Sequence, residues 1–128
     1  MSAFTKLFLV LGGINGALVV GMGAFGAHAL KTRISSEMMA VYHTAVLYHA
    51  IHALGLIAIG LVAAWLPDSA YLKSAGWSMF AGIALFSGSL YLLSITGVRW
   101  LGAITPIGGV AFLLAWILFC VAALKASN

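Results

Sequence analysis

Four histidines carry most of the ionisable chemistry within the long apolar stretches of this 128-residue sequence. His49 and His52 are three residues apart, which places them about 60° from each other on one face of an α-helix. His43 lies about 180° from His52, so one helix cannot direct all three imidazoles at one ion. His49 and His52 could supply two ligands to a transition metal, or one axial ligand to a haem, if other helices supplied the rest.

Two other uses of the histidines stay open from the spacing. An antiparallel hairpin would bring His28 and His43 to similar depth near one membrane interface, and imidazoles that titrate near neutrality could relay protons. Alternatively the imidazoles are neutral and are satisfied by backbone groups, by Tyr48 or Asn15, or by interfacial water. We favour this structural role and predict no cofactor, with a metal or haem site as the alternative.

No arrangement in the sequence resembles a catalytic set. A serine–histidine nucleophile needs an acidic partner to orient the base, and no Asp or Glu lies within the apolar stretches. We therefore predict that the protein is not an enzyme.

Small and polar residues predict where the helices meet. Gly12 and Gly16 form a small-x-x-x-small pair that allows close helix approach, and Asn15 between them can bond to a neighbouring helix. Ser87 and Ser89 can bond backbone carbonyls or a facing helix. Thr105, followed by proline, is a candidate helix cap.

The spacing of charged residues predicts the elements that hold these side chains. The eight charges are Lys6, Lys31, Arg33, Glu37, Asp68, Lys73, Arg99 and Lys125. They leave intervals of 24, 30, 25 and 25 uncharged residues, and a bilayer core needs roughly 20 apolar helical residues. The sequence therefore predicts one all-α domain over 1–128, an integral membrane four-helix bundle with short loops and helices at about 6–30, 37–66, 72–94 and 104–125.

Composition excludes a water-soluble domain. The chain is 64% hydrophobic and 6% charged, whereas soluble domains carry about 25% charged residues. The net charge of +4 comes from basic residues at predicted helix ends, so we expect anionic membrane lipid and not nucleic acid as the partner. Three of the four tryptophans also lie near helix ends, whereas Trp116 is predicted to pack in mid-membrane.

Four spans place both termini on one side of the membrane. That side carries Lys6, Lys73 and Lys125, and the other carries three basic residues as well. The charge distribution alone therefore does not orient the protein.

Four motifs in order resemble one known family. They are GAFGAHALK (23–31), YHTAVLYHAIHAL (42–54), FSGSLYLL (86–93) and LGAITPIGG (101–109). Together they resemble domain of unknown function family 423, the YgdD-like small inner-membrane proteins. The resemblance implies a four-helix protein of the bacterial inner (cytoplasmic) membrane and favours cytoplasmic termini.

The resemblance also ranks the histidines. Tyr48 and His52 match a Tyr-x-x-x-His element of the family, and His28 matches the histidine of its GAFGAH motif. His49 stands where many relatives have Gln. If the family has a metal site, His28 and His52 are thus better candidates than His49.

Glycine-rich helix faces without a catalytic set favour a structural or accessory role. We expect a small membrane protein that works through lipid or protein contacts, as a homo-oligomer or as an accessory subunit of a membrane complex. One alternative is a metal- or haem-binding protein that uses His28, His49 and His52. A second alternative is a small-solute or proton-coupled transporter formed by an oligomer.

Overall fold

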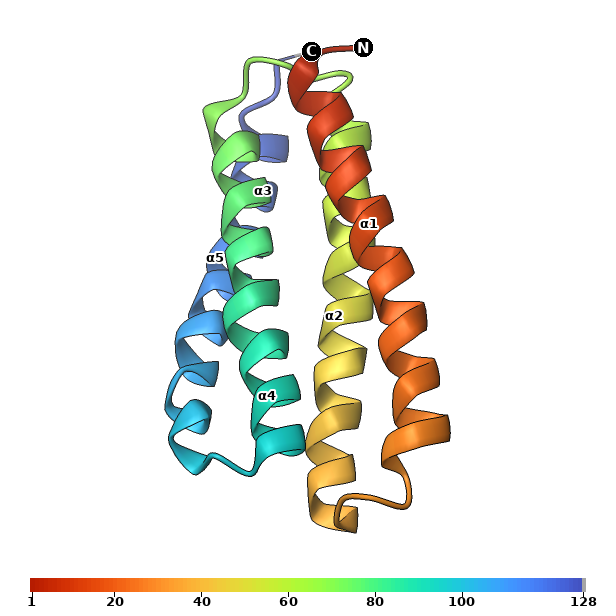
Figure 1. The fold of residues 1–128 in the computed structure, drawn as a ribbon. Coiled ribbons are helices and arrows are strands. Elements are labelled where there is room, and N and C mark those ends of the chain that lie inside the picture. The colour runs from red at the N-terminus through yellow and green to blue at the C-terminus, as the bar shows by residue number, and fades with distance from the viewer. Residues whose placement is uncertain (128) are drawn as a thin grey trace.

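Four long helical spans run up and down in antiparallel order (Figure 1). A computed structural model describes residues 1–127. The spans cover 3–30, 36–62, 70–96 and 99–124, and each is long and apolar enough to cross a membrane. Both termini lie at the same end of the bundle (Figure 1). The chain is thus an all-α membrane helical bundle, as the charge spacing predicted.

Two of the spans contain a π-helical turn. The first consists of α1 (Ala3–Phe25) and the π turn Gly26–Leu30. The second is α2 (Ser36–Val62). The third consists of α3 (Ala70–Gly82), the π turn Ile83–Ser87 and α4 (Gly88–Thr96), and the fourth of a 3-10 turn (Arg99–Ala103) and α5 (Thr105–Leu124). A π turn changes which residues face inward beyond it, and such turns are frequent at functional sites.

Serine caps set the starts of the first three spans. The Ser2 hydroxyl accepts from the Thr5 amide at 3.0 Å, so the first span begins at Ala3 and not at Lys6. Ser35 caps α2 through the Met38 amide, and Ser69 caps α3, which begins two residues before the predicted start. A capping side chain satisfies an amide that the first turn leaves free.

Two of the predicted helix ends and one predicted cap differ from the structure. Helix α2 stops at Val62, not near Leu66, because the Ala64 and Trp65 amides bond carbonyls three residues back. The third span runs on to Thr96, two residues beyond its predicted end. Thr105 does not cap α5, because the 3-10 turn leads directly into that helix, and the Ile104 carbonyl accepts from the Ile107 and Gly108 amides.

The helices pack as two hairpins joined through α2. Helix α1 packs along α2, and α3 packs along α5. Helix α2 also contacts α4 and the π turn Ile83–Ser87, whereas the described residues show no comparable packing of α1 against α3, α4 or α5. The Phe8 ring of α1 packs against Gly76 and Trp77 of α3, and beyond this contact one side of α1 is left without a helix partner.

Glycine permits the closest helix contacts. A Cβ on Gly12 would overlap Ile57 and the Ala53 carbonyl of α2, so this glycine sets the α1–α2 approach. Gly16 has nothing within 4 Å of its Cβ position and makes no such contact. A Cβ on Gly108 would overlap the backbone of Leu85 and Phe86, so α5 lies directly against the π turn of the third span.

Candidate functional site

His49 is the centre of a buried polar group that joins three spans. Its Nδ1 lies 2.9 Å from the Tyr91 hydroxyl and its Nε2 lies 2.9 Å from Oδ1 of Asn15. All three side chains are buried, with exposed fractions of 4%, 9% and 5% for His49, Tyr91 and Asn15. The polar triad, as we call these three residues, links α2 to α4 and α1.

The partners of the triad fix the direction of each hydrogen bond. The Asn15 amide nitrogen donates to the Leu11 carbonyl at 2.9 Å, so its Oδ1 is the atom that accepts from His49. A neutral imidazole donates through one nitrogen and accepts through the other. His49 therefore carries its proton on Nε2, and its Nδ1 accepts from the Tyr91 hydroxyl.

His52 has the opposite proton arrangement. The Trp116 indole donates to its Nε2 at 3.0 Å, so His52 must donate from Nδ1 to the Tyr48 carbonyl, 2.6 Å away. The ring also stacks on Phe112, with centroids 3.5 Å apart. Both nitrogens of His52 are thus engaged within the bundle, and its Nε2 lone pair is occupied by Trp116.

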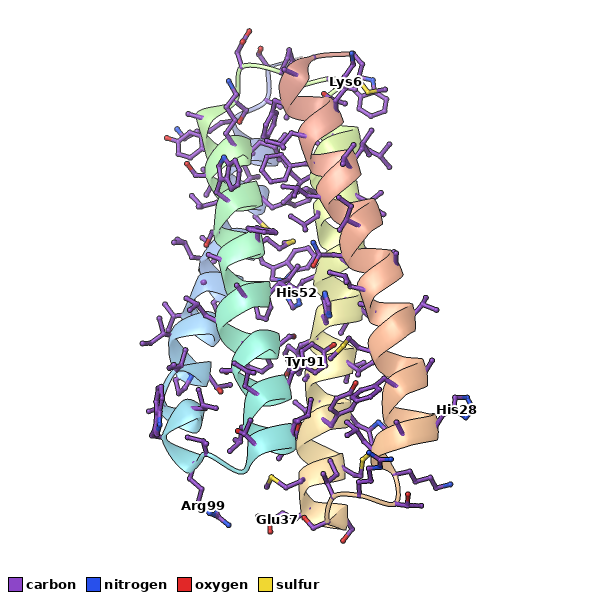
Figure 2. The ribbon with its side chains drawn as sticks, in the orientation of Figure 1. Lys6, His28, Glu37, His52, Tyr91 and Arg99 are labelled. Carbon is purple, nitrogen blue, oxygen red and sulfur yellow. The ribbon has the colours of Figure 1, made fainter. Side chains whose placement is uncertain are left out.

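The structure does not bring the four histidines together. Figure 2 shows His28 pointing away from the bundle, whereas His52 lies between the helices. His28 and His43 are both exposed. Among residues 1–127, no group of three or more His, Cys, Asp or Glu side chains is placed to hold a metal ion.

The serine and threonine hydroxyls bond helices to one another. Ser87, in the π turn, donates to the Ala45 carbonyl of α2 at 2.9 Å. Ser89 donates to the Phe86 carbonyl, so the hydroxyl of Thr105, 2.6 Å away, must donate to Ser89. The Ser87 bond thus joins the third span to α2, and the Ser89–Thr105 bond joins it to α5. Tyr48 instead packs its ring against Phe86 and Phe112.

A groove of about 420 Å³ opens beside the triad, between α1 and the third span. All three triad residues line it. The rest of its wall comes from α1, from the π turn Ile83–Ser87 and from their neighbours: Leu11, Ile14, Leu18, Met22, Phe80, Ile83, Ala84 and Gly88. Helix α1 packs along α2 and meets α3 nearer the terminal end, where the Phe8 ring lies against Gly76 and Trp77, and the groove lies beyond that contact.

Two residues of these networks were missed from the sequence. Tyr91 lies four residues after Ser87 and so shares its helix face, which is the signal that could have found it. Trp116 was predicted to pack in mid-membrane, but its partner His52 was not foreseen. Both side chains donate to a histidine on another helix, and the number of residues between two helices does not predict which of their side chains will meet.

The sequence matches a family and several curated membrane proteins. The family described as "Protein of unknown function (DUF423)" matches residues 22–109. A "UPF0382 membrane protein YwdK" of Bacillus subtilis is 54% identical over 94% of this chain and 98% of its own length. UPF0382 membrane proteins of Staphylococcus epidermidis and Staphylococcus saprophyticus are 48% and 43% identical, each over 94% of this chain and 97% and 98% of their own. No solved structure matches.

Proposed function

Since this chain belongs to the DUF423 family of proteins of unknown function, we propose its role from its own geometry: a non-enzymatic membrane protein that works through lipid and protein contacts. The names of its relatives place them in membranes and attach no reaction to them. The proposal takes the protein as a homo-oligomer, or as an accessory subunit that presents the same surface to another membrane protein.

The outward face of α1 is the observation that carries this proposal. Gly13, Ala17, Gly21 and Ala24 are exposed and lie within an arc of about 80°. Among residues 1–127, a Cβ on Gly13 or Gly21 would meet nothing within 4 Å, so the described part of the chain packs nothing against these two glycines. Small residues at such spacing let a second helix approach closely in a membrane, where van der Waals packing drives association.

The outer helices also offer most of their surface to lipid. Only 17% of the most apolar window of the first span is buried, compared with 44% in the second and third spans. Trp65 and Trp100 are exposed near helix ends, where indole rings favour the membrane interface. The exposed surface of α1 therefore contacts lipid wherever no protein partner covers it.

Enlarging the stripe is expected to weaken self-association. Ala17→Ile should raise the dissociation constant at least tenfold, because the branched side chain holds the two helices apart. Ala123→Ile is the matched control, since Ala123 is an exposed alanine at the far end of α5. Energy transfer between labelled copies in liposomes, measured over a range of protein-to-lipid ratios, gives both constants. Equal effects of the two substitutions, or a monomer at every ratio, would contradict the homo-oligomer.

The proposal places the protein in the bacterial inner membrane with cytoplasmic termini. Its support is the family resemblance, because three basic residues lie at each end of the bundle. In a Cys120→Ser background, Arg99→Cys should react with a membrane-impermeant maleimide on spheroplasts. Lys125→Cys at the terminal end should react only after the membrane is opened. The reverse pattern would show the opposite orientation.

A further inference from the structure

We propose that the groove beside the polar triad binds an uncharged, membrane-soluble molecule of the isoprenoid quinone class, which carries oxygen atoms attached to a ring. The second N–H of Asn15 would donate to a ring carbonyl, the Tyr91 oxygen would accept from a ring hydroxyl of the quinol form, and the apolar walls would hold the ring and the chain. This ligand site is independent of the contact role proposed for the outer face of α1, because the groove lies on a different side of that helix.

The triad keeps hydrogen-bonding capacity that the chain does not use. The Asn15 amide has two N–H groups and donates one of them to Leu11, while its oxygen accepts one bond from His49 and can accept a second. The Tyr91 hydroxyl donates to His49 and retains acceptor capacity. The second Asn15 N–H is therefore the one donor of the triad that these bonds leave for a quinone carbonyl, whereas the Asn15 and Tyr91 oxygens can accept only from a hydroxyl, such as that of a quinol.

The depth of the triad selects the occupant. His49 is the middle residue of α2, about 20 Å from either helix end at 1.5 Å per residue. The hydrocarbon core is about 30 Å thick, so the triad lies near the bilayer centre. Phospholipid headgroups and ester carbonyls remain near the surfaces of that core. The occupant must therefore bring an uncharged oxygen into the hydrocarbon, as a quinone or quinol ring does.

The remaining lining agrees with that class. No charged side chain lines the groove, and a charged ligand at this depth would be costly. The volume of about 420 Å³ lies within the 300–1,000 Å³ usual for small-molecule sites. Ala84 and Gly88 leave space on the wall formed by the third span, and Phe80 supplies an aromatic surface. A molecule dissolved in the bilayer can reach the groove sideways, since α1 does not close over the third span.

A short-chain isoprenoid naphthoquinone is the probe for this site. Binding of the radiolabelled quinone to the protein in phosphatidylcholine nanodiscs is measured against empty nanodiscs, with unlabelled quinone and squalene, an apolar isoprenoid that lacks oxygen, as the two competitors. We expect saturable binding. The concentration of squalene needed for half-displacement should be at least tenfold higher than that of unlabelled quinone. Equal displacement by squalene would overturn the proposal, because the groove would then select hydrocarbon and not an oxygen.

Two variants test the groove and the triad separately. Ala84→Phe fills the groove and leaves the triad intact, so it should weaken quinone binding at least tenfold, whereas Ala81→Phe, at an exposed alanine outside the groove, should not. Asn15→Leu should abolish the preference for quinone over squalene. Binding unchanged by Ala84→Phe would overturn the proposal. So would a change in oligomeric state caused by Ala84→Phe in place of lost binding, since the groove would then be an interface between copies.

Discussion

Gly108→Ala is expected to destabilise the protein by about 3 kcal/mol, near the upper end of the usual cost of overpacking. The new methyl group would overlap backbone atoms of Leu85 and Phe86, which cannot turn away as a flexible side chain can. Helix α5 or the π turn Ile83–Ser87 must therefore shift, and the shift disturbs the bond from Ser87 to the Ala45 carbonyl. Reversible unfolding in mixed micelles measures the loss.

The neighbouring glycine supplies the control for this substitution. A Cβ on Gly109 would lie 3.8 Å from the Phe86 ring, which is an ordinary van der Waals contact. Gly109→Ala is therefore expected to change stability by no more than about 0.5 kcal/mol. Alanine favours a helix more than glycine does, so helix propensity cannot produce a loss at either position. If both alanines cost the same, overlap with the Leu85 and Phe86 backbone would not be the cause, and the close approach of α5 would be wrong.

His49→Leu is expected to cost about 2 kcal/mol. Leucine removes the partner of the Tyr91 hydroxyl and of the Asn15 oxygen, and unpaired polar groups at this depth cost about 1–3 kcal/mol. Because the triad acts as a unit, combining His49→Leu with Asn15→Leu should cost less than the two single changes added together. The unfolding free energies of the two single variants and the double variant measure this coupling.

An exposed histidine on α2 serves as the control for His49→Leu, and the positions of the imidazole protons test the hydrogen bonds of the triad. His43→Leu alters an exposed side chain on the same helix and should leave stability within about 0.5 kcal/mol of the parent. Nitrogen NMR of histidine-labelled protein should show His49 protonated on Nε2 and His52 on Nδ1. The same tautomer at both positions would contradict the hydrogen-bond directions on which the triad rests.

Several features of the fold could be predicted from the sequence because the membrane imposes them. A bilayer of fixed thickness requires about 20 apolar residues per helix, so the spacing of eight charges was enough to give four spans. An even number of spans then places both termini at one end. The starts of the helices were less well predicted, because capping by Ser2 and Ser69 depends on backbone conformation at single residues.

The inward-facing sides of the helices could not be predicted in the same way. In water, an apolar stripe on one face marks the side that packs inward. In this chain the spans are apolar all round, since lipid accepts the outer faces as readily as protein accepts the inner ones. Composition therefore did not distinguish the four histidines from one another. Spacing grouped them by helix face and by depth, and the family resemblance favoured His28 and His52 over His49.

The tertiary structure decided which of the four histidines have buried partners. Packing of α2 against α4 and α5 gave His49 and His52 different partners, and it left His28 and His43 at the surface. The groove beside Asn15 also depends on packing, since one wall comes from α1 and the other from α3, α4 and the π turn Ile83–Ser87. The sequence by itself determined a four-span membrane protein, because the thickness of the hydrocarbon core sets the length of each apolar stretch. The site was decided by tertiary structure, because hydrogen bonds between helices depend on which faces meet.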